Sequence, residues 1–348
     1  MKNKKLDNQV MATFTRQLGL VLDSDLPISS GLEIIQSKTK SDRLRTIIIS
    51  VQGELKNGYS LSESLLKYSD DFTPFVVHMI ELGEKSGSLT NVLNQIADTL
   101  EKEIEIKSKV KAALSYPIIL SLMMLSVIVL LVVKVLPSFS DILSSLGGEM
   151  PMFTDWMLNS SKFIGNNIVV ILGAILAIVI VYFLYKSTKK GSYAIDKMKF
   201  YMPIQKDIVS ALVGTKFARN LSVLLKSGFS FSIAMEMLKP IIDNQYMSSL
   251  IDEAVIKLKD GEPLSDVVEK FNIFPGVMIR LLSVAQQTGH MDKMLDKVAV
   301  EMEKEADLKL ENVATVIEPL LIIILSVLIG IILVSVILPI INILNSIG

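Results

Sequence analysis

The chain has 348 residues, half of them hydrophobic, and its 35 Lys and Arg are balanced by 36 Asp and Glu. This balance argues against nucleic acid as a partner, because phosphate neutralisation needs a basic excess. The absence of Cys excludes disulfides, thiolate metal sites and a cysteine nucleophile. Long uncharged runs alternate with segments dense in Lys, Glu and Asp, a pattern typical of a membrane protein with aqueous parts.

The first segment, residues 1–115, is charged and its apolar residues follow a helical spacing. Phe14, Leu18, Val21 and Leu22 lie at positions i, i+4, i+7 and i+8. Gly-containing turns divide the segment into pieces of helix length, and alternating runs of β-branched residues are missing. We therefore expect a compact helical module whose last stretch, 100–114, continues as one helix into the next apolar run.

Two apolar segments follow, at residues 116–136 and 168–185, each close to the roughly 20 residues that a helix needs to cross a bilayer. The first has only Lys134 as a charge, near its end, and the second has none. The sequence predicts two transmembrane helices joined by an extracytoplasmic loop, residues 137–167.

The remaining chain repeats this plan with a charged segment, 186–317, an apolar segment, 318–341, and a short tail, 342–348. Lys residues gather before the first span and after the second, and cytoplasmic flanks carry such an excess. Both charged segments and the N-terminus are thus predicted to be cytoplasmic, and the C-terminus extracytoplasmic. The predicted fold is an all-α membrane protein with two cytoplasmic helical-bundle modules and three transmembrane helices.

An internal repeat relates the two charged segments. At a shift of 203 residues Phe14-Thr-Arg16-Gln-Leu18 matches Phe217-Ala-Arg219-Asn-Leu221, and Leu55-x-x-Gly58 matches Leu258-x-x-Gly261. At a shift of 202 the match continues through Lys85-Ser86-Gly87 with Gln287-Thr288-Gly289, and Tyr116-Pro117 with Glu318-Pro319. The repeating unit is therefore a module followed by its own span.

Two local features are candidates for function. The turn in Glu81-Leu-Gly83-Glu84-Lys85-Ser86-Gly87-Ser88-Leu89 is explained either by ordinary helix capping or by a docking or inter-subunit surface. Pro117 and Pro319 indicate a break in the helix where the module meets the membrane, because Pro lacks a backbone donor. We interpret Tyr116, Pro117, Glu318 and Pro319 as module-to-membrane joints.

Signatures of chemistry are missing from the sequence. It has no Gly-x-x-x-x-Gly-Lys-Ser/Thr phosphate loop and no Gly-x-Ser-x-Gly elbow. His78 and His290 are isolated from each other, so we expect no metal site. We predict no cofactor, no catalytic residue and no enzymatic activity.

The paired Phe-x-Arg-x-Leu starts, the Gly-Glu-Lys-Ser-Gly turn, the two joints and the outside motif from Gly147-Gly148 to Thr154 together resemble a known family. The chain is similar to the inner-membrane platform protein of type IV pilus and type II secretion machines, the GspF/PilC family. The resemblance implies cytoplasmic bundles of about six helices, a bacterial inner-membrane location and self-association into a homo-oligomer. It also implies coupling of a cytoplasmic hexameric assembly ATPase to insertion of pilin or pseudopilin subunits, with other inner-membrane assembly proteins as neighbours.

By position, the resemblance assigns Gly83, Glu84 and Gly87 to a first contact motif, and Gln286 with Gly289 to a second. The second motif of the family usually carries Glu, so Gln286 is a departure that loses a charge.

A small-substrate membrane transporter is the main alternative, because transporters also combine several spans with internal repeats. Three spans without a midplane charge make a poor substrate path. A membrane-anchored enzyme or receptor is a third reading, which the missing catalytic constellations disfavour.

Overall fold

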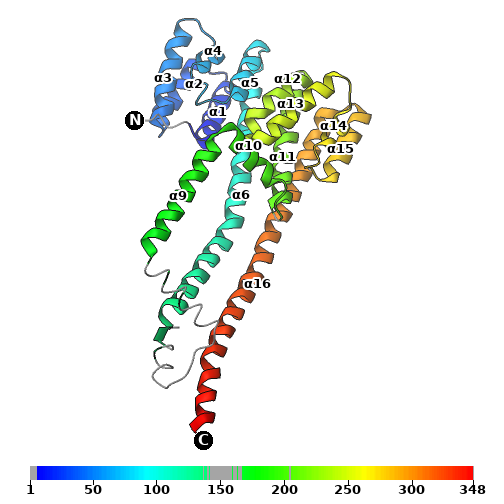
Figure 1. Cartoon of the computed structure of the whole chain (residues 1–348). Coiled ribbons are helices and arrows are strands. Elements are labelled where there is room, and N and C mark those ends of the chain that lie inside the picture. Colours follow the sequence, from blue (N-terminus) through cyan, green and yellow to red (C-terminus); the bar gives the residue numbers. More distant parts are fainter. Residues whose placement is uncertain are drawn as a thin grey trace. The chain divides into compact units, whose positions relative to one another are not determined.

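The computed structural model describes residues 6–135, 137–138, 141, 159, 163, 167–203 and 205–347, which form helices and turns and contain no strand (Figure 1). The all-α expectation is confirmed for this part of the chain. The predicted loop at 137–167, including the Gly147–Thr154 motif, lies outside the described residues apart from isolated positions.

Each module consists of six helices. The first module contains α1 (Asn8–Asp23), α2 (Ile28–Lys38), α3 (Asp42–Lys56), α4 (Leu61–Leu66), α5 (Pro74–Lys85) and α6 (Leu89–Leu130). The second contains α11 (Gln205–Lys226), α12 (Phe231–Ile242), α13 (Gln245–Lys259), α14 (Leu264–Lys270), α15 (Gly276–Thr288) and α16 (Met291–Ile347). Between them lie the short π-helix η1 (Leu131–Val135), α9 (Ile168–Ser187) and α10 (Lys189–Lys199).

The repeat seen in the sequence is also a repeat of helix boundaries. Helices α2, α3 and α4 begin 203 residues before α12, α13 and α14, whereas α5 and α6 begin 202 residues before α15 and α16. The register therefore changes between the fourth and fifth helices. We call two residues counterparts when they are related by 203 residues up to α4 and by 202 from α5 onwards.

Contacts divide the chain into two compact units. One contains residues 1–109 and 192–309, and the other contains residues 110–191 and 310–348. Both modules thus belong to one unit, and a single hydrophobic cluster extends through it. Phe14 and Leu18 of α1 and their counterparts Phe217 and Leu221 of α11 are at most 1% exposed. The helical stripes predicted from the sequence therefore form the core.

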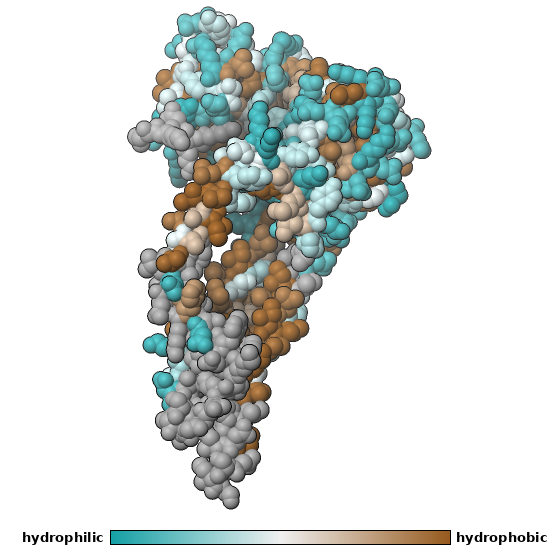
Figure 2. Space-filling view, in the orientation of Figure 1, coloured by the Kyte–Doolittle hydropathy of each residue, from teal (hydrophilic) through white to brown (hydrophobic). Residues whose placement is uncertain are grey.

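Three helices of the described chain are long and apolar enough to cross a membrane: α6, α11 and α16. Helix α11 is 61% buried over its apolar window, so we assign it to the core of the second module. Helices α6 and α16 include the spans predicted at 116–136 and 318–341. The apolar side chains of these segments are exposed (Figure 2).

Helix α9 contains the span predicted at 168–185. Its described side chains Val170, Ile178 and Phe183 are each more than 60% exposed. Such a surface is too apolar for water, where helices normally show a polar face. A lipid environment accounts for it.

The helix break expected at Pro117 and Pro319 is not found. Helix α6 runs through Pro117, and α16 runs through Pro319, without interruption. Helices in apolar surroundings tolerate Pro because neighbouring hydrogen bonds are retained. Around Pro117 the backbone carbonyl is used as well, since Ser121 Oγ donates a hydrogen bond to it at 2.7 Å.

Candidate functional site

The turn after α5 begins with a close approach of two helices. Gly83 is buried, and a Cβ atom at this position would lie 3.0 Å from Leu89 Cα and 3.0 Å from Val92 Cβ. Such distances are shorter than real Cβ contacts, so only Gly allows α5 to pack this closely against the start of α6. Gly83 therefore has a packing role inside the first module.

Glu84 caps a helix other than its own. Its carboxylate accepts hydrogen bonds from Leu61 N at 2.6 Å, Ser62 N at 3.1 Å and Ser62 Oγ at 2.5 Å. These groups belong to the first turn of α4, whose free N–H donors and positive dipole end favour a carboxylate. The α4 N-terminus also has a capping box between Ser60 and Glu63. Glu84 thus connects the end of α5 to the start of α4.

The remaining motif residues lie at the surface. Gly87 and Gly289 are exposed and have φ angles of +67° and +69°, a left-handed conformation that favours Gly. Gln286 is exposed, and its side chain has no printed contact comparable to that of Glu84 among the described residues. The structure therefore offers Gly87, Gln286 and Gly289 to solvent and uses Gly83 and Glu84 internally. Partner contact at these positions stays a prediction.

The predicted joint residues of the two repeats meet each other. Tyr116 Oη donates a hydrogen bond to Glu318 Oε1 at 3.2 Å. Both residues are exposed, and they are exact counterparts in the repeat. The contact shows that α6 and α16 lie side by side at this level, within the second unit.

An ion pair recurs at the same place in each module, and sequence reasoning missed it. In the first module Arg16 Nη2 lies 2.9 Å from Glu101 Oε2 and also pairs with Asp98. In the second module the counterparts Arg219 and Glu303 are 2.8 Å apart. Hydrogen bonds to Glu101 and Asp98 raise the pKa of Arg16 further above its ordinary value. Extending the 202-residue shift to charged residues would have identified both pairs.

Glu303 is also the centre of an ionic hub between the modules, which we define as Glu303 with Arg219, Lys102 and Lys109. Its carboxylate lies 3.4 Å from both Lys102 Nζ and Lys109 Nζ of α6. Lys109 pairs in addition with Asp307 at 2.8 Å, and this hydrogen bond raises the pKa of Lys109. Because Glu303 is only 14% exposed, solvent screens the hub less than an ordinary surface pair.

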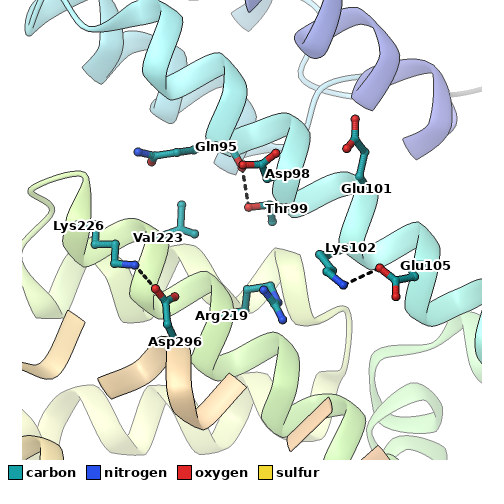
Figure 3. Close-up of a pocket in the computed structure, with 10 residues that line it drawn as sticks. All are labelled: Gln95, Asp98, Thr99, Glu101, Lys102, Glu105, Arg219, Val223, Lys226 and Asp296. Atoms are coloured by element: carbon teal, nitrogen blue, oxygen red, sulfur yellow. Dashed lines mark hydrogen bonds and ion pairs between the residues drawn. The ribbon is translucent and has the colours of Figure 1, made fainter. Parts of the chain in front are cut away.

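A polar cavity of about 480 Å³ lies beside the hub, between α6, α11 and α16 (Figure 3). Its charged lining residues are paired with opposite charges: Lys226 with Asp296, and Lys102 with Glu105 at 2.6 Å. Among the described residues no group of three potential ligands could hold a metal ion. The arrangement is suited to holding helices in register rather than to transforming a substrate.

Comparison with known proteins agrees with this arrangement. The family model described as type II secretion system (T2SS), protein F matches residues 14–137 and again residues 217–339. The two matches begin at the counterpart residues Phe14 and Phe217, so the family model reproduces the internal repeat.

Relatives are similar over nearly the whole chain. The type IV pilus assembly protein PilC of Thermus thermophilus is 30% identical over 97% of this chain and 83% of its own length. PilC of Pseudomonas aeruginosa is 28% identical, covering 99% of this chain and 92% of that protein. The type II secretion system protein F of Aeromonas hydrophila is 26% identical, with 97% and 87% covered. With two matching regions and full-length relatives, the chain belongs to the type II secretion system protein F family, the GspF/PilC family.

Proposed function

We propose that this chain is the inner-membrane platform of a type IV pilus or type II secretion machine, and that it couples a cytoplasmic assembly ATPase to insertion of pilin or pseudopilin subunits into a growing filament. Family membership supports the coarser statement directly: the chain is a non-enzymatic inner-membrane assembly protein of one of these systems. The coupling step is the proposal.

One observation carries it. Helices α6 and α16 each begin in the core of a module and continue without a break into an exposed apolar segment. The buried residues Leu93 and Leu295 hold the beginnings of these helices in the module cores. An unbroken helix resists bending, so a displacement of a module is transmitted along it. A protein that passes motion to the membrane needs this connection and needs no reaction site.

The proposed topology places both modules and the N-terminus in the cytoplasm, with the C-terminus outside. It rests on the Lys-rich flanks of the apolar helices. Because the chain lacks Cys, single cysteines introduced at Ser86 and Ser346 can be labelled selectively. A membrane-impermeant maleimide added to intact cells should label Ser346→Cys and leave Ser86→Cys unlabelled. The reverse pattern would reject the topology.

The proposed partners are the hexameric ATPase, pilins, other inner-membrane assembly proteins and further copies of the chain. A photo-crosslinking amino acid at exposed Ser86, beside the Gly87 turn, tests the contact motif without straining a positive φ angle. Capture of the ATPase or of a pilin from cells would support it. The same probe at exposed Ile49 of α3 is the matched control, and equal capture from both positions would contradict a specific surface.

Gene deletion tests the function as a whole. We expect loss of filaments or of secretion, with pilins retained in the membrane, and recovery when the intact gene is restored. Normal filaments in the deletion strain would reject the platform. Impaired uptake of a small solute with normal filaments would instead favour the transporter alternative.

A further inference from the structure

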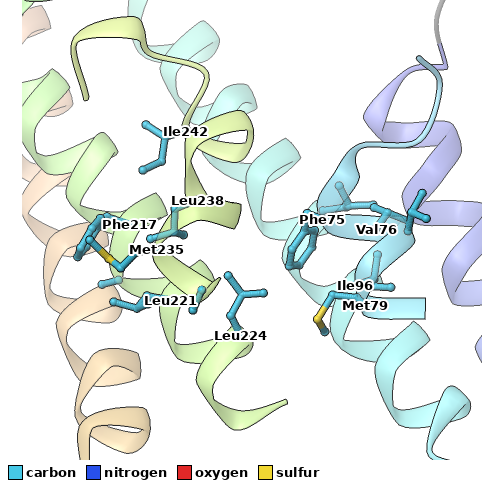
Figure 4. Packing of buried hydrophobic residues seen from close by; sticks show 14 of the residues in the cluster. Phe75, Val76, Met79, Ile96, Phe217, Leu221, Leu224, Met235, Leu238 and Ile242 are labelled. Atoms are coloured by element: carbon cyan, nitrogen blue, oxygen red, sulfur yellow. The ribbon is translucent and has the colours of Figure 1, made fainter. Parts of the chain in front are cut away.

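The contact between the two modules joins unlike faces of the repeat. Helix α5 packs against α12, and Ser227 Oγ donates a hydrogen bond to Gln95 Oε1 of α6 at 3.1 Å. In the close view, Phe75 and Met79 are on the side facing Leu224 (Figure 4). The first module thus uses its α5–α6 face and the second module its α11–α12 face. Their counterparts are the α15–α16 face of the second module and the α1–α2 face of the first.

The α15–α16 face is uncovered where the α5–α6 face is covered. Met79 is fully buried and Phe75 is 2% exposed, whereas their counterparts Leu281 and Val277 are partly exposed. Farther along, Ile106 of α6 is 8% exposed, and its counterpart Leu308 of α16 is 58% exposed. The second module therefore retains an apolar face of the kind that the first module buries.

The α1–α2 face shows the same contrast with the α11–α12 face. Leu224 is fully buried and its counterpart Val21 is partly exposed. The other exposed members of the face are Leu20 at 55%, Leu26 at 44% and Ile34 at 46%, whose counterparts Val223, Phe229 and Met237 are all partly buried. The chain thus has one apolar face free at each end of the pair of modules.

Charges on the two free faces are complementary. Lys297 of α16 stands at the place of Gln95, and Ser24 stands at the place of Ser227. Asp23 and Asp25 flank Ser24. Lys297, Asp23 and Asp25 are exposed and have no ion pair among the described residues. Where the internal contact has a neutral hydrogen bond, a copy of that contact between chains would have a Lys opposite two Asp.

We propose that the α1–α2 face of one chain binds the α15–α16 face of a second copy, reproducing between chains the contact that α5–α6 and α11–α12 make within one. This names the geometry of the self-association in the proposed function and rests on that part of it. The interface is heterologous, so successive chains add head to tail and form a ring if the rotation closes.

The ionic hub has no complete copy in the contact between chains. Lys109, which binds Glu303 and Asp307, has Glu311 as its counterpart. The contact between chains therefore lacks one of the cations that stabilise the internal contact. We expect whole chains to dissociate while the two modules of each chain stay together.

Cross-linking of the full-length protein in its membrane tests the geometry, because the chain has no Cys of its own. Two differently tagged variants, Ser24→Cys and Lys297→Cys, are co-expressed and oxidised. We expect a disulfide dimer that carries both tags, and little dimer from either variant alone. Dimers of Ser24→Cys with itself, or of Lys297→Cys with itself, would indicate a two-fold interface and overturn the proposal. The double variant Gln95→Cys, Ser227→Cys is the internal control, which should cross-link within one chain.

A second variant pair tests the apolar part of the contact. Leu20→Asp places a charge in the α1–α2 face, and Ile49→Asp places one on α3 at a similar exposure, 55% against 53%. We expect Leu20→Asp to weaken self-association at least about ten-fold in detergent and Ile49→Asp to leave it nearly unchanged. Equal effects would contradict the proposal.

The two proposals fail separately. The tagged dimer is read without any filament, so a dimer in a strain with normal filaments after gene deletion would reject the platform and keep the contact. Filament loss on deletion, without the mixed dimer, would keep the platform and reject the contact.

Discussion

Glu84 shows how a single residue of the turn motif acts in the fold. Its carboxylate accepts three hydrogen bonds from Leu61 and Ser62 at the N-terminus of α4. We expect Glu84→Ala to lower the free energy of unfolding by about 1–2 kcal/mol, since it removes a cap and leaves backbone donors unpaired. Gln286→Ala is the matched control and should change it by less than about 0.5 kcal/mol. Urea unfolding of the detergent-solubilised protein measures both, and similar losses for the two variants would show that the cap is not what stabilises the first module.

Glu103 of α6 is a second residue with a measurable effect, in this case on pH dependence. Burial raises its pKa above the ordinary 4.5, against the attraction of Lys216 and Lys107, and Asp243 raises it further. Because the folded state holds this proton more tightly than the unfolded state, its contribution to stability is lost as pH rises above 4.5 through the folded pKa. Glu103→Gln still offers Asn8 an acceptor and should add on the order of 0.5 kcal/mol at pH 7. Melting temperatures of wild type and variant should converge toward pH 4, and a constant difference would contradict the assignment.

At the scale of helices, the approach of α5 to α6 depends on Gly83. Gly83→Ala forces its Cβ against Leu89 Cα, a backbone atom that cannot move alone, and we expect a loss of about 1–3 kcal/mol. Gly53 of α3 is exposed with no atom within 4 Å of a Cβ, so Gly53→Ala should instead add about 0.5–1 kcal/mol. Thermal unfolding followed by circular dichroism distinguishes the two directions, and stabilisation by both would refute the close contact.

Much of this helix arrangement could be predicted from the sequence. Apolar periodicity around Phe14 and Phe217 indicated the core helices, and the register shifts anticipated where helices begin. The partner of Glu84 could not be predicted, because it lies 22 residues away in another helix and periodicity describes only neighbours along one helix. Helix α10 was also not anticipated: Tyr193 of this helix packs edge to face against Tyr246 of α13, and no counterpart of α10 exists in the first module. Pro117 misled because local backbone chemistry was outweighed by the continuity of the surrounding helix.

At the scale of the whole chain, the ionic hub joins the modules that the repeat produced. Glu303→Gln leaves Arg219, Lys102 and Lys109 facing a neutral group, and Arg219 Nε is already buried without a hydrogen-bond partner among the described residues. We expect a loss of about 1.5–3 kcal/mol and faster exchange of an internal Gln95→Cys, Ser227→Cys disulfide. The counterpart variant Glu101→Gln should cost less than about 1 kcal/mol, because Arg16 keeps Asp98 and the pair is more exposed. Equal losses would mean that Glu303 acts only within its own module.

The low exposure of Glu303 also has a consequence for ionic strength. At 14% exposure the hub is largely shielded from dissolved ions, whereas Lys297 and Asp23 are open to them. Raising sodium chloride from about 0.05 to about 0.5 M shortens the screening length from roughly 14 to 4 Å and weakens exposed pairs first. Salt should therefore release one chain from the next while the two halves of each chain remain joined, so that concentrated buffers would yield intact single chains and dilute ones would yield assemblies.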